Sequence, residues 1–144
     1  MVKWKYEGLE VSNKPPSSTK WGFVYLITYT NGQKYIGKKQ FWSVTKKKFG
    51  KKQLAEITDN RAKKYTMVTR ENDWRKYIGS SKETKHLTVE SKEIVEVCED
   101  RINLTYCEIK HMFSQDVLVN RTFLNSNILG KFFCGKIKGT TCSD

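Results

Sequence analysis

The chain has 144 residues, the size of one domain with a single ordinary core. Its 27 lysines and arginines against 15 acidic residues give a formal net charge of +12 and a pI of about 9.6, which favours nucleic acid over a membrane surface as the partner. No window approaches the roughly eighteen apolar residues of a membrane span and the start lacks a secretion signal, so we expect a cytoplasmic protein without membrane contact.

Residues 1–20 are predicted to form an N-terminal arm and linker ahead of a single domain at 21–144. Trp4 and Tyr6 alternate with lysines, and Lys14-Pro15-Pro16-Ser17-Ser18 is typical of an extended linker.

A β-hairpin is predicted at about 21–42. Phe23 to Tyr29 and Lys34 to Gln40 are rich in aromatic and β-branched residues, and Asn31-Gly32 marks a turn between them. A two-residue turn would put Tyr25 and Tyr35 on opposite faces of the hairpin. A three-residue turn, with Gly32 in the left-handed position, would pair Tyr29 with Gln33 and Tyr25 with Gly37, so that both tyrosines and Lys39 share one face.

A basic insertion follows at about 43–76. Between residues 46 and 76, eleven lysines and arginines stand against four acids. The segment is either a solvated loop or an insertion that binds the phosphates of a nucleic acid strand.

A short helix is predicted to begin at Ser80 or Ser81, because Ser80 and Glu83 have the spacing of a capping box and the free amides would suit a phosphate. Tyr77-Ile78-Gly79 repeats the tripeptide Tyr35-Ile36-Gly37. We interpret the repeat as a decoy for the catalytic hairpin motif, because no strand with a Gly-x-x-Tyr motif precedes it at hairpin distance.

A third strand is predicted at Glu93 to Cys98, followed by a helix capped by Asn103 and ending near Gln115. Its expected apolar stripe comprises Ile102, Tyr106, Ile109 and Phe113, with Glu108 at the border. The tail after residue 117 is expected to return irregularly to the sheet. The order of elements predicts a small α+β domain in which helices flank a three-stranded antiparallel sheet.

Hydrolysis of a phosphodiester needs a route for the proton of the attacking water, positive charge against the phosphate, and usually a divalent ion held by a carboxylate. A free phenol, with a pKa near ~10, is a poor base at neutral pH, but a lysine on the same face and a nearby metal would lower that pKa. Tyr35 with Lys39 meets this need. The cysteines and histidines form no zinc pattern.

These residues resemble the GIY-YIG nuclease family. The two named motifs are Gly22 to Tyr25 and Tyr35-Ile36-Gly37, and a helical glutamate, Glu108, is trailed by Asn125. The resemblance covers about residues 21–130 and is greatest to phage-encoded members that carry an insertion after the second motif and a W-x-x-Y-x-G-S-S-like segment, here Trp74 to Ser81.

The resemblance implies a GIY-YIG-like fold and a catalytic set of Tyr25, Tyr35, Lys39, Arg75, Glu108 and Asn125. Glu108 would be the only protein ligand of one Mg²⁺ or Mn²⁺ ion. Asn125 would brace the site, with Asn127 as the substitute. The family commonly has an arginine on the helix after its second motif, and its role here is open among Lys39, Arg75 and Lys85.

The expected partner is DNA, in double-stranded form. Specificity would come from the insertion, the arm or formation of a homodimer. The residues expected to contact DNA are polar or basic: Lys46, Lys47, Lys48, Lys51, Lys52, Arg75, Ser80, Ser81, Lys82 and Lys85.

The leading hypothesis is an endonuclease that hydrolyses DNA with one metal ion, Mg²⁺ or Mn²⁺, and with tyrosine and lysine assistance to the water. The alternative is a non-catalytic nucleic-acid-binding module that retained the fold. A basic structural or ribosome-associated protein would explain the charge but not the paired tyrosines.

Overall fold

The computed structural model describes residues 2–11 and 20–137, so the predicted linker at 14–18 lies outside the described residues. The chain divides into two compact units. Unit 1 comprises Met1–Phe41 and Asp73–Asp144, and unit 2 comprises Trp42–Asn72.

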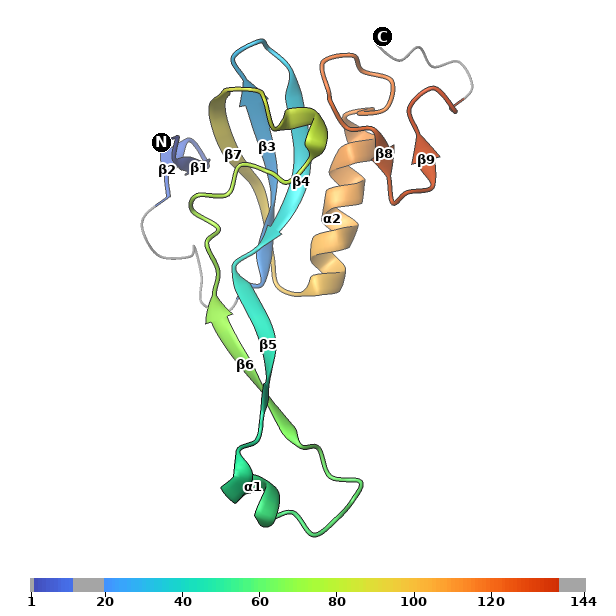
Figure 1. The fold of residues 1–144 in the computed structure, drawn as a ribbon. Helices are drawn as coiled ribbons and strands as arrows, with labels where there is room; N and C mark the ends of the chain where they lie inside the picture. Colours follow the sequence, from blue (N-terminus) through green and yellow to red (C-terminus); the bar gives the residue numbers. More distant parts are fainter. Residues whose placement is uncertain (1, 12–19, 138–144) are drawn as a thin grey trace. The chain divides into compact units, whose positions relative to one another are not determined.

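Unit 1 is built on a five-stranded mixed sheet with strand order β2-β1-β7-β3-β4 (Figure 1). The strands are β1 (Trp4–Tyr6), β2 (Leu9–Glu10), β3 (Gly22–Tyr29), β4 (Lys34–Gln40) and β7 (Val89–Cys98). β3 runs antiparallel to both β4 and β7, whereas β1 is parallel to β7. The fold is α+β as expected, but the prediction of three antiparallel strands is wrong.

The N-terminal strands account for that difference. β1 pairs with the edge of β7 that would otherwise lack a partner, and Trp4 is buried against the sheet with only 2 % of its surface exposed. Its indole nitrogen donates to the carbonyl oxygen of Trp74 at 2.9 Å. The alternation of Trp4 and Tyr6 therefore belongs to a strand of the sheet. Burial of the large Trp4 ring favours the pairing of this strand with β7.

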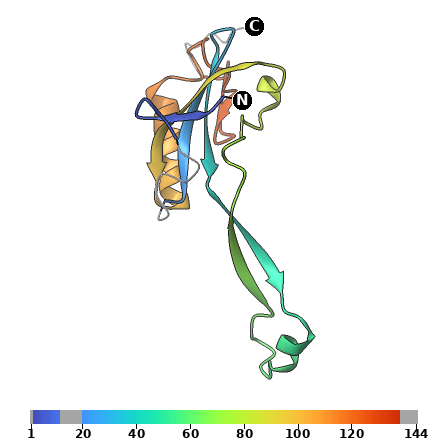
Figure 2. The same ribbon diagram turned by 90° about the vertical axis from the view of Figure 1, so that its left-hand side faces the viewer.

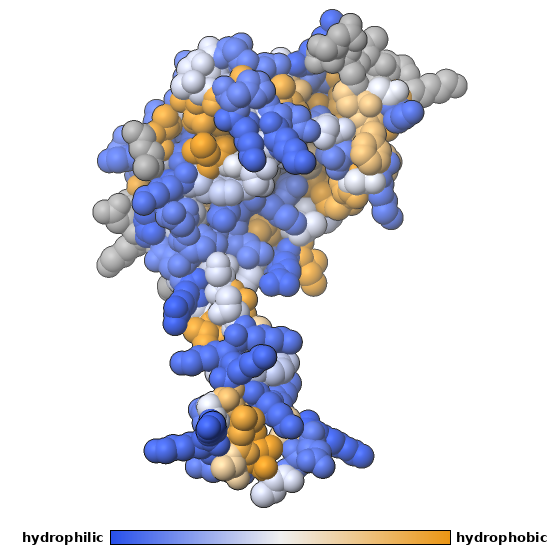
Figure 3. Space-filling model, viewed as in Figure 1, coloured by the Kyte–Doolittle hydropathy of each residue, from blue (hydrophilic) through white to orange (hydrophobic). Residues whose placement is uncertain are grey.

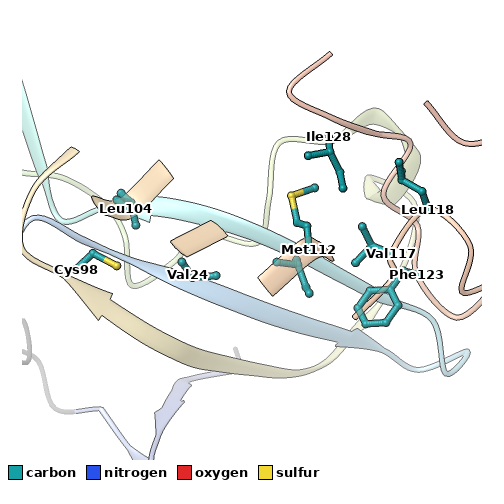
Figure 4. Packing of buried hydrophobic residues seen from close by; sticks show 9 residues of the cluster. Val24, Cys98, Leu104, Met112, Val117, Leu118, Phe123 and Ile128 are labelled. Carbon is teal, nitrogen blue, oxygen red and sulfur yellow. The ribbon is translucent and has the colours of Figure 1, made fainter. Parts of the chain in front are cut away.

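Both faces of β3 are buried, as its continuous apolar sequence requires. One face packs against α2 (Arg101–Ser114) and the C-terminal segment through Val24, Leu104 and Met112 among others (Figure 4). The other face packs against an aromatic cluster that includes Phe23 and Trp74. Figure 2 shows the sheet between α2 and the segment that carries the 3₁₀ turn η1 (Lys82–Thr84).

The buried face of α2 differs from the predicted stripe. Ile102 is 82 % exposed and Tyr106 66 % exposed, whereas Leu104 and Met112 are buried. The helix starts earlier than expected because Asp100, not Asn103, is the N-cap and accepts from the Asn103 amide at 2.7 Å. Positions 104, 108 and 112 therefore face the sheet, which puts Glu108 on the packed face rather than at its border.

The C-terminal segment runs beside β4 and covers the edge of the sheet. The amide of Lys34 donates to the Thr122 carbonyl and the amide of Leu124 donates to the Lys34 carbonyl, both at 2.8 Å. The short pair β8 (Asn127–Ile128) and β9 (Phe132–Phe133) follows. The expected return of the tail to the sheet is confirmed.

Unit 2 is an antiparallel ribbon of β5 (Trp42–Lys48) and β6 (Tyr65–Glu71) with the short helix α1 (Lys51–Ala55) between the strands. The structure describes every residue of this unit, and none of them is buried. Its surface is mostly hydrophilic (Figure 3), with nine lysines and arginines against three acids. The insertion is thus an ordered strand pair without a core of its own.

Candidate active site

The hairpin of β3 and β4 has the three-residue turn that places both tyrosines on one face. The Tyr29 amide donates to the Gln33 carbonyl at 2.8 Å, and Gly32 has φ +85°, in the left-handed region that glycine adopts without strain. Tyr25 pairs with Gly37. The register also pairs Ile27 with Tyr35 and Phe23 with Lys39, so Tyr25, Tyr35 and Lys39 share one face, as the three-residue alternative predicts.

The Tyr25 phenol crosses the backbone of β4 at Gly37. A Cβ atom on Gly37 would overlap the phenolic oxygen, and one on Gly79 would lie 3.9 Å from it. Burial is the main cause that raises the pKa of Tyr25 far above its ordinary value, and the neighbouring Tyr77 adds to the shift. This phenol is therefore neutral at any physiological pH.

The pKa of Tyr35 is also raised, first by burial and then by the negative charge of Glu108. The expectation that Lys39 lowers the pKa of Tyr35 is not met in the metal-free protein. The Lys39 ammonium lies 4.4 Å from the centre of the Tyr77 ring instead. The ammonium group therefore makes a cation–π contact with this third tyrosine.

Glu108 lies on the face of α2 that packs against the sheet, and its side chain is 20 % exposed. Its Oε2 atom is buried and has no hydrogen-bond donor among the described residues. Burial raises the pKa of Glu108, and the charge of Lys38 opposes that shift. β4 is the outer strand of the sheet, and the charge of Glu108 acts across it on both Tyr25 and Tyr35.

Sequence reasoning missed Lys38, the lysine nearest to this carboxylate. Its Nζ lies 3.9 Å from Glu108 Oε2 and donates to the Thr105 hydroxyl at 2.8 Å. Strand alternation puts Lys38 on the face opposite the tyrosines, which is why attention to the tyrosine face alone overlooks it. One signal could have identified Lys38. Leu104 and Glu108 are four residues apart, so they share the helix face that packs against β4.

Asn125 braces the outer strand. It is 5 % exposed, its Oδ1 accepts from the Ile36 amide at 3.1 Å, and its Nδ2 donates to the Ile36 carbonyl at 2.8 Å. Both hydrogen bonds fix the middle residue of Tyr35-Ile36-Gly37. Asn127 is engaged elsewhere, because its Oδ1 accepts from the Gly130 amide at 2.9 Å.

The repeated tripeptide Tyr77-Ile78-Gly79 is not part of the β3–β4 hairpin, as predicted, but it packs against that hairpin. The Tyr77 and Tyr25 rings are 5.8 Å apart, centre to centre. The preceding Arg75 stacks its guanidinium on the Trp74 ring at 4.7 Å. Buried Lys92 donates to the carbonyl oxygens of Arg75 and Tyr77, at 3.0 and 3.2 Å.

The predicted helix after this tripeptide is a single 3₁₀ turn with Ser81 as its N-cap. The Ser81 hydroxyl donates to the Glu83 carboxylate, so the capping interaction begins one residue later than the predicted Ser80–Glu83 pair. Lys82 and Lys85 are exposed beside it. A turn this short does not present the aligned amides of a helix terminus, so a phosphate here would be held by side chains.

The lysines of unit 2 that are predicted to bind DNA are exposed on the ribbon and at the start of α1: Lys46, Lys47, Lys48, Lys51 and Lys52. Lys46 lies 4.5 Å from the centre of the Tyr65 ring on the paired strand. The ribbon therefore presents positive charge to solvent.

Within residues 2–11 and 20–137, no group of three or more histidine, cysteine, aspartate or glutamate side chains could together hold a metal ion. A site with one carboxylate ligand agrees with this finding, and the unsatisfied Glu108 oxygen fits a hard cation whose other ligands are waters and a phosphate oxygen. No helix in the described part of the chain has both the length and the apolar character that crossing a membrane requires.

A hairpin carrying two tyrosines, a helical glutamate beside its outer strand and an asparagine bracing that strand define a nuclease-type α+β domain. A family model described as "Putative endonuclease segE, GIY-YIG domain" matches residues 4–128, so the chain belongs to the GIY-YIG nuclease family, in its SegE-like branch. Membership of this family indicates an endonuclease that acts on DNA. No curated protein and no solved structure matches the chain.

Proposed function

We propose that this protein is a phage-type endonuclease that hydrolyses double-stranded DNA with one divalent metal ion. The observation that carries the proposal is Glu108, whose buried Oε2 lacks a donor and whose charge acts on both hairpin tyrosines. A bound Mg²⁺ or Mn²⁺ ion supplies Lewis acidity toward the phosphate oxygen. Glu108 would hold that ion through its partly exposed carboxylate.

The two phenols would handle the attacking water as neutral groups. Tyr35 is the more exposed of the pair, and Glu108 is the first charge to act on it after burial itself. Tyr35 would therefore orient the water beside Glu108. Because the phenolate form of each tyrosine is unfavourable, each phenol would release one proton as it receives another.

Positive charge on the protein would stabilise the phosphate. Lys39 and Arg75 remain the candidates for the family's arginine role, and Lys85 is the third. Lys38 joins them because it already lies beside Glu108. The exposed lysines of unit 2, with Ser80, Ser81 and Lys82, would contact the DNA backbone.

Incubation with supercoiled plasmid tests the proposal. The protein is expected to nick or linearise the plasmid with Mg²⁺ and to stop cutting when EDTA is added. Glu108→Gln keeps the size of the side chain and removes its charge, so we expect cleavage to fall at least about 100-fold while DNA binding persists, since losing even an outer partner of a metal ligand costs 10–100-fold. Glu90→Gln, which changes an exposed glutamate on β7, is the matched control.

Two outcomes would contradict the proposal. If Glu108→Gln cuts at the parental rate, the metal lies elsewhere. If the unmodified protein binds DNA but cuts with neither Mg²⁺ nor Mn²⁺, it is a non-catalytic binding module on the nuclease fold.

A further inference from the structure

Tyr77 joins the tyrosines of the hairpin through direct contacts. Its hydroxyl is a hydrogen-bond partner of the buried Tyr25 phenol, and the two rings meet edge to face. The Lys39 ammonium lies over the Tyr77 ring, 4.4 Å from the ring centre. The repeated tripeptide therefore adds a third phenol to the two that the hairpin supplies.

The glycines of both tripeptides leave room for one oxygen atom. The Tyr25 hydroxyl lies where a side chain on Gly37 would be, and a Cβ on Gly79 would stand 3.9 Å from it. Gly79 also has φ +95°, a conformation that other residues rarely adopt. The two copies of Tyr-Ile-Gly thus enclose the same phenolic oxygen.

A buried lysine holds the second copy in place. Lys92 is fully buried, donates to the carbonyls of Arg75 and Tyr77, and lies 4.5 Å from the centre of the Trp4 ring. Burying an ammonium group is costly unless it is hydrogen-bonded, so these carbonyls are fixed partners rather than casual contacts. The backbone on either side of Lys76 is therefore anchored to the sheet.

Beyond Tyr77 the hydroxyl groups continue to the surface. The Tyr77 hydroxyl donates to Ser80 Oγ at 3.4 Å, and Ser80 is exposed. On the other side, Tyr35 is the diagonal neighbour of Tyr25 on the same face of the hairpin, within reach of a long side chain. Tyr25, Tyr77 and Ser80 thus form a line of contacting hydroxyl groups that reaches the surface, and Tyr35 is the neighbour of Tyr25 on the hairpin face.

We propose that Tyr35, Tyr25, Tyr77 and Ser80 form a proton relay that carries the proton of the attacking water from the site to solvent. The inference rests on the endonuclease function proposed above. The water O–H bond breaks as a new O–H bond forms on Tyr35, which releases its own proton to Tyr25. Tyr25, Tyr77 and Ser80 each pass on one proton in turn, and the last goes to bulk water. Every phenol ends neutral, and no electrons leave or enter the chain of groups.

The relay solves a problem that the burial of the phenols creates. Burial disfavours the phenolate form of Tyr25 and of Tyr35. Neither tyrosine can therefore be deprotonated in advance and act as a phenolate base. Concerted transfer through hydroxyl groups avoids that charged intermediate. Tyr77 contacts Tyr25 and would act through it, so it is a positioning and relay residue.

Single-turnover cleavage of plasmid by the full-length protein, measured in mixtures of H₂O and D₂O, tests the relay. For the unmodified protein we expect a curved plot of rate against deuterium fraction, because several protons move together. Tyr77→Phe keeps the ring and deletes only the hydroxyl. We expect it to lower the rate about 100-fold, the lower end for a lost proton-transfer group, with an unchanged Kd for DNA and a straighter plot.

Tyr29→Phe is the matched control, because it removes another buried hydroxyl from the same face of β3 outside the relay. Equal losses of rate in both variants would make the effect of Tyr77 structural and overturn the relay. A straight plot for the unmodified protein would overturn it without any variant. Cleavage by Tyr77→Phe at the parental rate removes only the relay, whereas an unmodified protein that does not cut removes the endonuclease function as well.

Discussion

The Glu108 carboxylate lies in surroundings that favour its neutral form when no metal is bound. It packs on the buried side of α2, and burial raises its pKa although Lys38 is 3.9 Å away. At neutral pH the folded protein therefore carries an unfavourable charge. A bound cation would stabilise that charge, because the same carboxylate has an oxygen without a hydrogen-bond donor.

Glu108→Gln is expected to stabilise the metal-free protein at neutral pH. A raised carboxyl pKa favours folding below the ordinary pKa of the group, and this contribution is lost as the pH rises through the raised value. The melting temperature of Glu108→Gln should exceed that of the parent by a few degrees near pH 8, since about 1 kcal/mol shifts Tm by several degrees. The difference should vanish near pH ~4, where the glutamate is protonated.

Added Mg²⁺ should raise the melting temperature of the parent and leave that of Glu108→Gln unchanged, because a ligand stabilises only the state that binds it. Glu90→Gln, at an exposed position, should behave like the parent in both measurements. A Glu108→Gln protein that melts below the parent near pH 8 would show that the ionised carboxylate is instead well accommodated.

The outer strand β4 is held by backbone hydrogen bonds to β3 on one side. On the other side it is held by the C-terminal segment, through backbone hydrogen bonds at Lys34 and through the Asn125 side chain. Asn125 presents an acceptor and a donor to the two backbone groups of Ile36, as a neighbouring strand would. Tyr35 and Gly37 flank that residue. The brace therefore fixes the position of one phenol and the space that the Tyr25 phenol occupies.

Asn125→Asp is expected to destabilise the protein by about 1–3 kcal/mol, because a buried carboxylate oxygen would face the Ile36 carbonyl with no donor between them. Urea unfolding measures the loss. Asn127→Asp, which changes a more exposed residue of β8, should cost less than half as much. Equal costs at both positions would mean that Asn125 does not brace β4.

The elements also show how far sequence patterns reach. The hairpin register follows from local chemistry, since Gly32 in a three-residue turn settles which side chains share a face. The packed face of α2 could not be read in the same way. Ile102 and Tyr106 are more apolar than Glu108, yet tertiary packing leaves them exposed and buries the carboxylate. A carboxylate on the packed face breaks the apolar pattern on which such predictions depend.

At the scale of the whole chain, contacts between distant segments were the hardest to predict. Trp4 donates to the Trp74 carbonyl, and Lys92 on β7 holds the backbone around Tyr77. Neither contact has a periodic signal in the sequence, so residues 1–20 were predicted as an arm and the packing of the second Tyr-Ile-Gly against the hairpin was not predicted. The family match from residue 4 onward agrees with a domain that includes β1.

Unit 2 has the charge and form of a DNA-binding ribbon. The exposed strand β5 carries lysines on both faces, and no residue of the unit is buried. An isolated strand pair is marginally stable in water, so a polyanion that covers it would also stabilise it. The ribbon, not the catalytic face, should therefore dominate the electrostatic part of DNA affinity.

Neutralising five exposed lysines of the ribbon and α1 tests that division of labour. The affected residues are Lys46, Lys47, Lys48, Lys51 and Lys52, each changed to glutamine. Each lost phosphate contact lowers the slope of log K against log salt by roughly 0.9 on duplex DNA, so the slope should flatten by up to about 4.5 units. Cutting at saturating protein should survive, because no group of the candidate site is altered.

Two comparisons complete the test. The same net charge is removed by changing five exposed lysines of unit 1, namely Lys3, Lys5, Lys110, Lys131 and Lys136, and this control should flatten the slope far less. Tyr35→Phe should do the reverse of the ribbon variant: it deletes only the phenolic oxygen, so binding persists and turnover collapses. If both five-lysine variants flatten the slope equally, net charge rather than the ribbon governs binding, and normal cutting by Tyr35→Phe would remove that tyrosine from the mechanism.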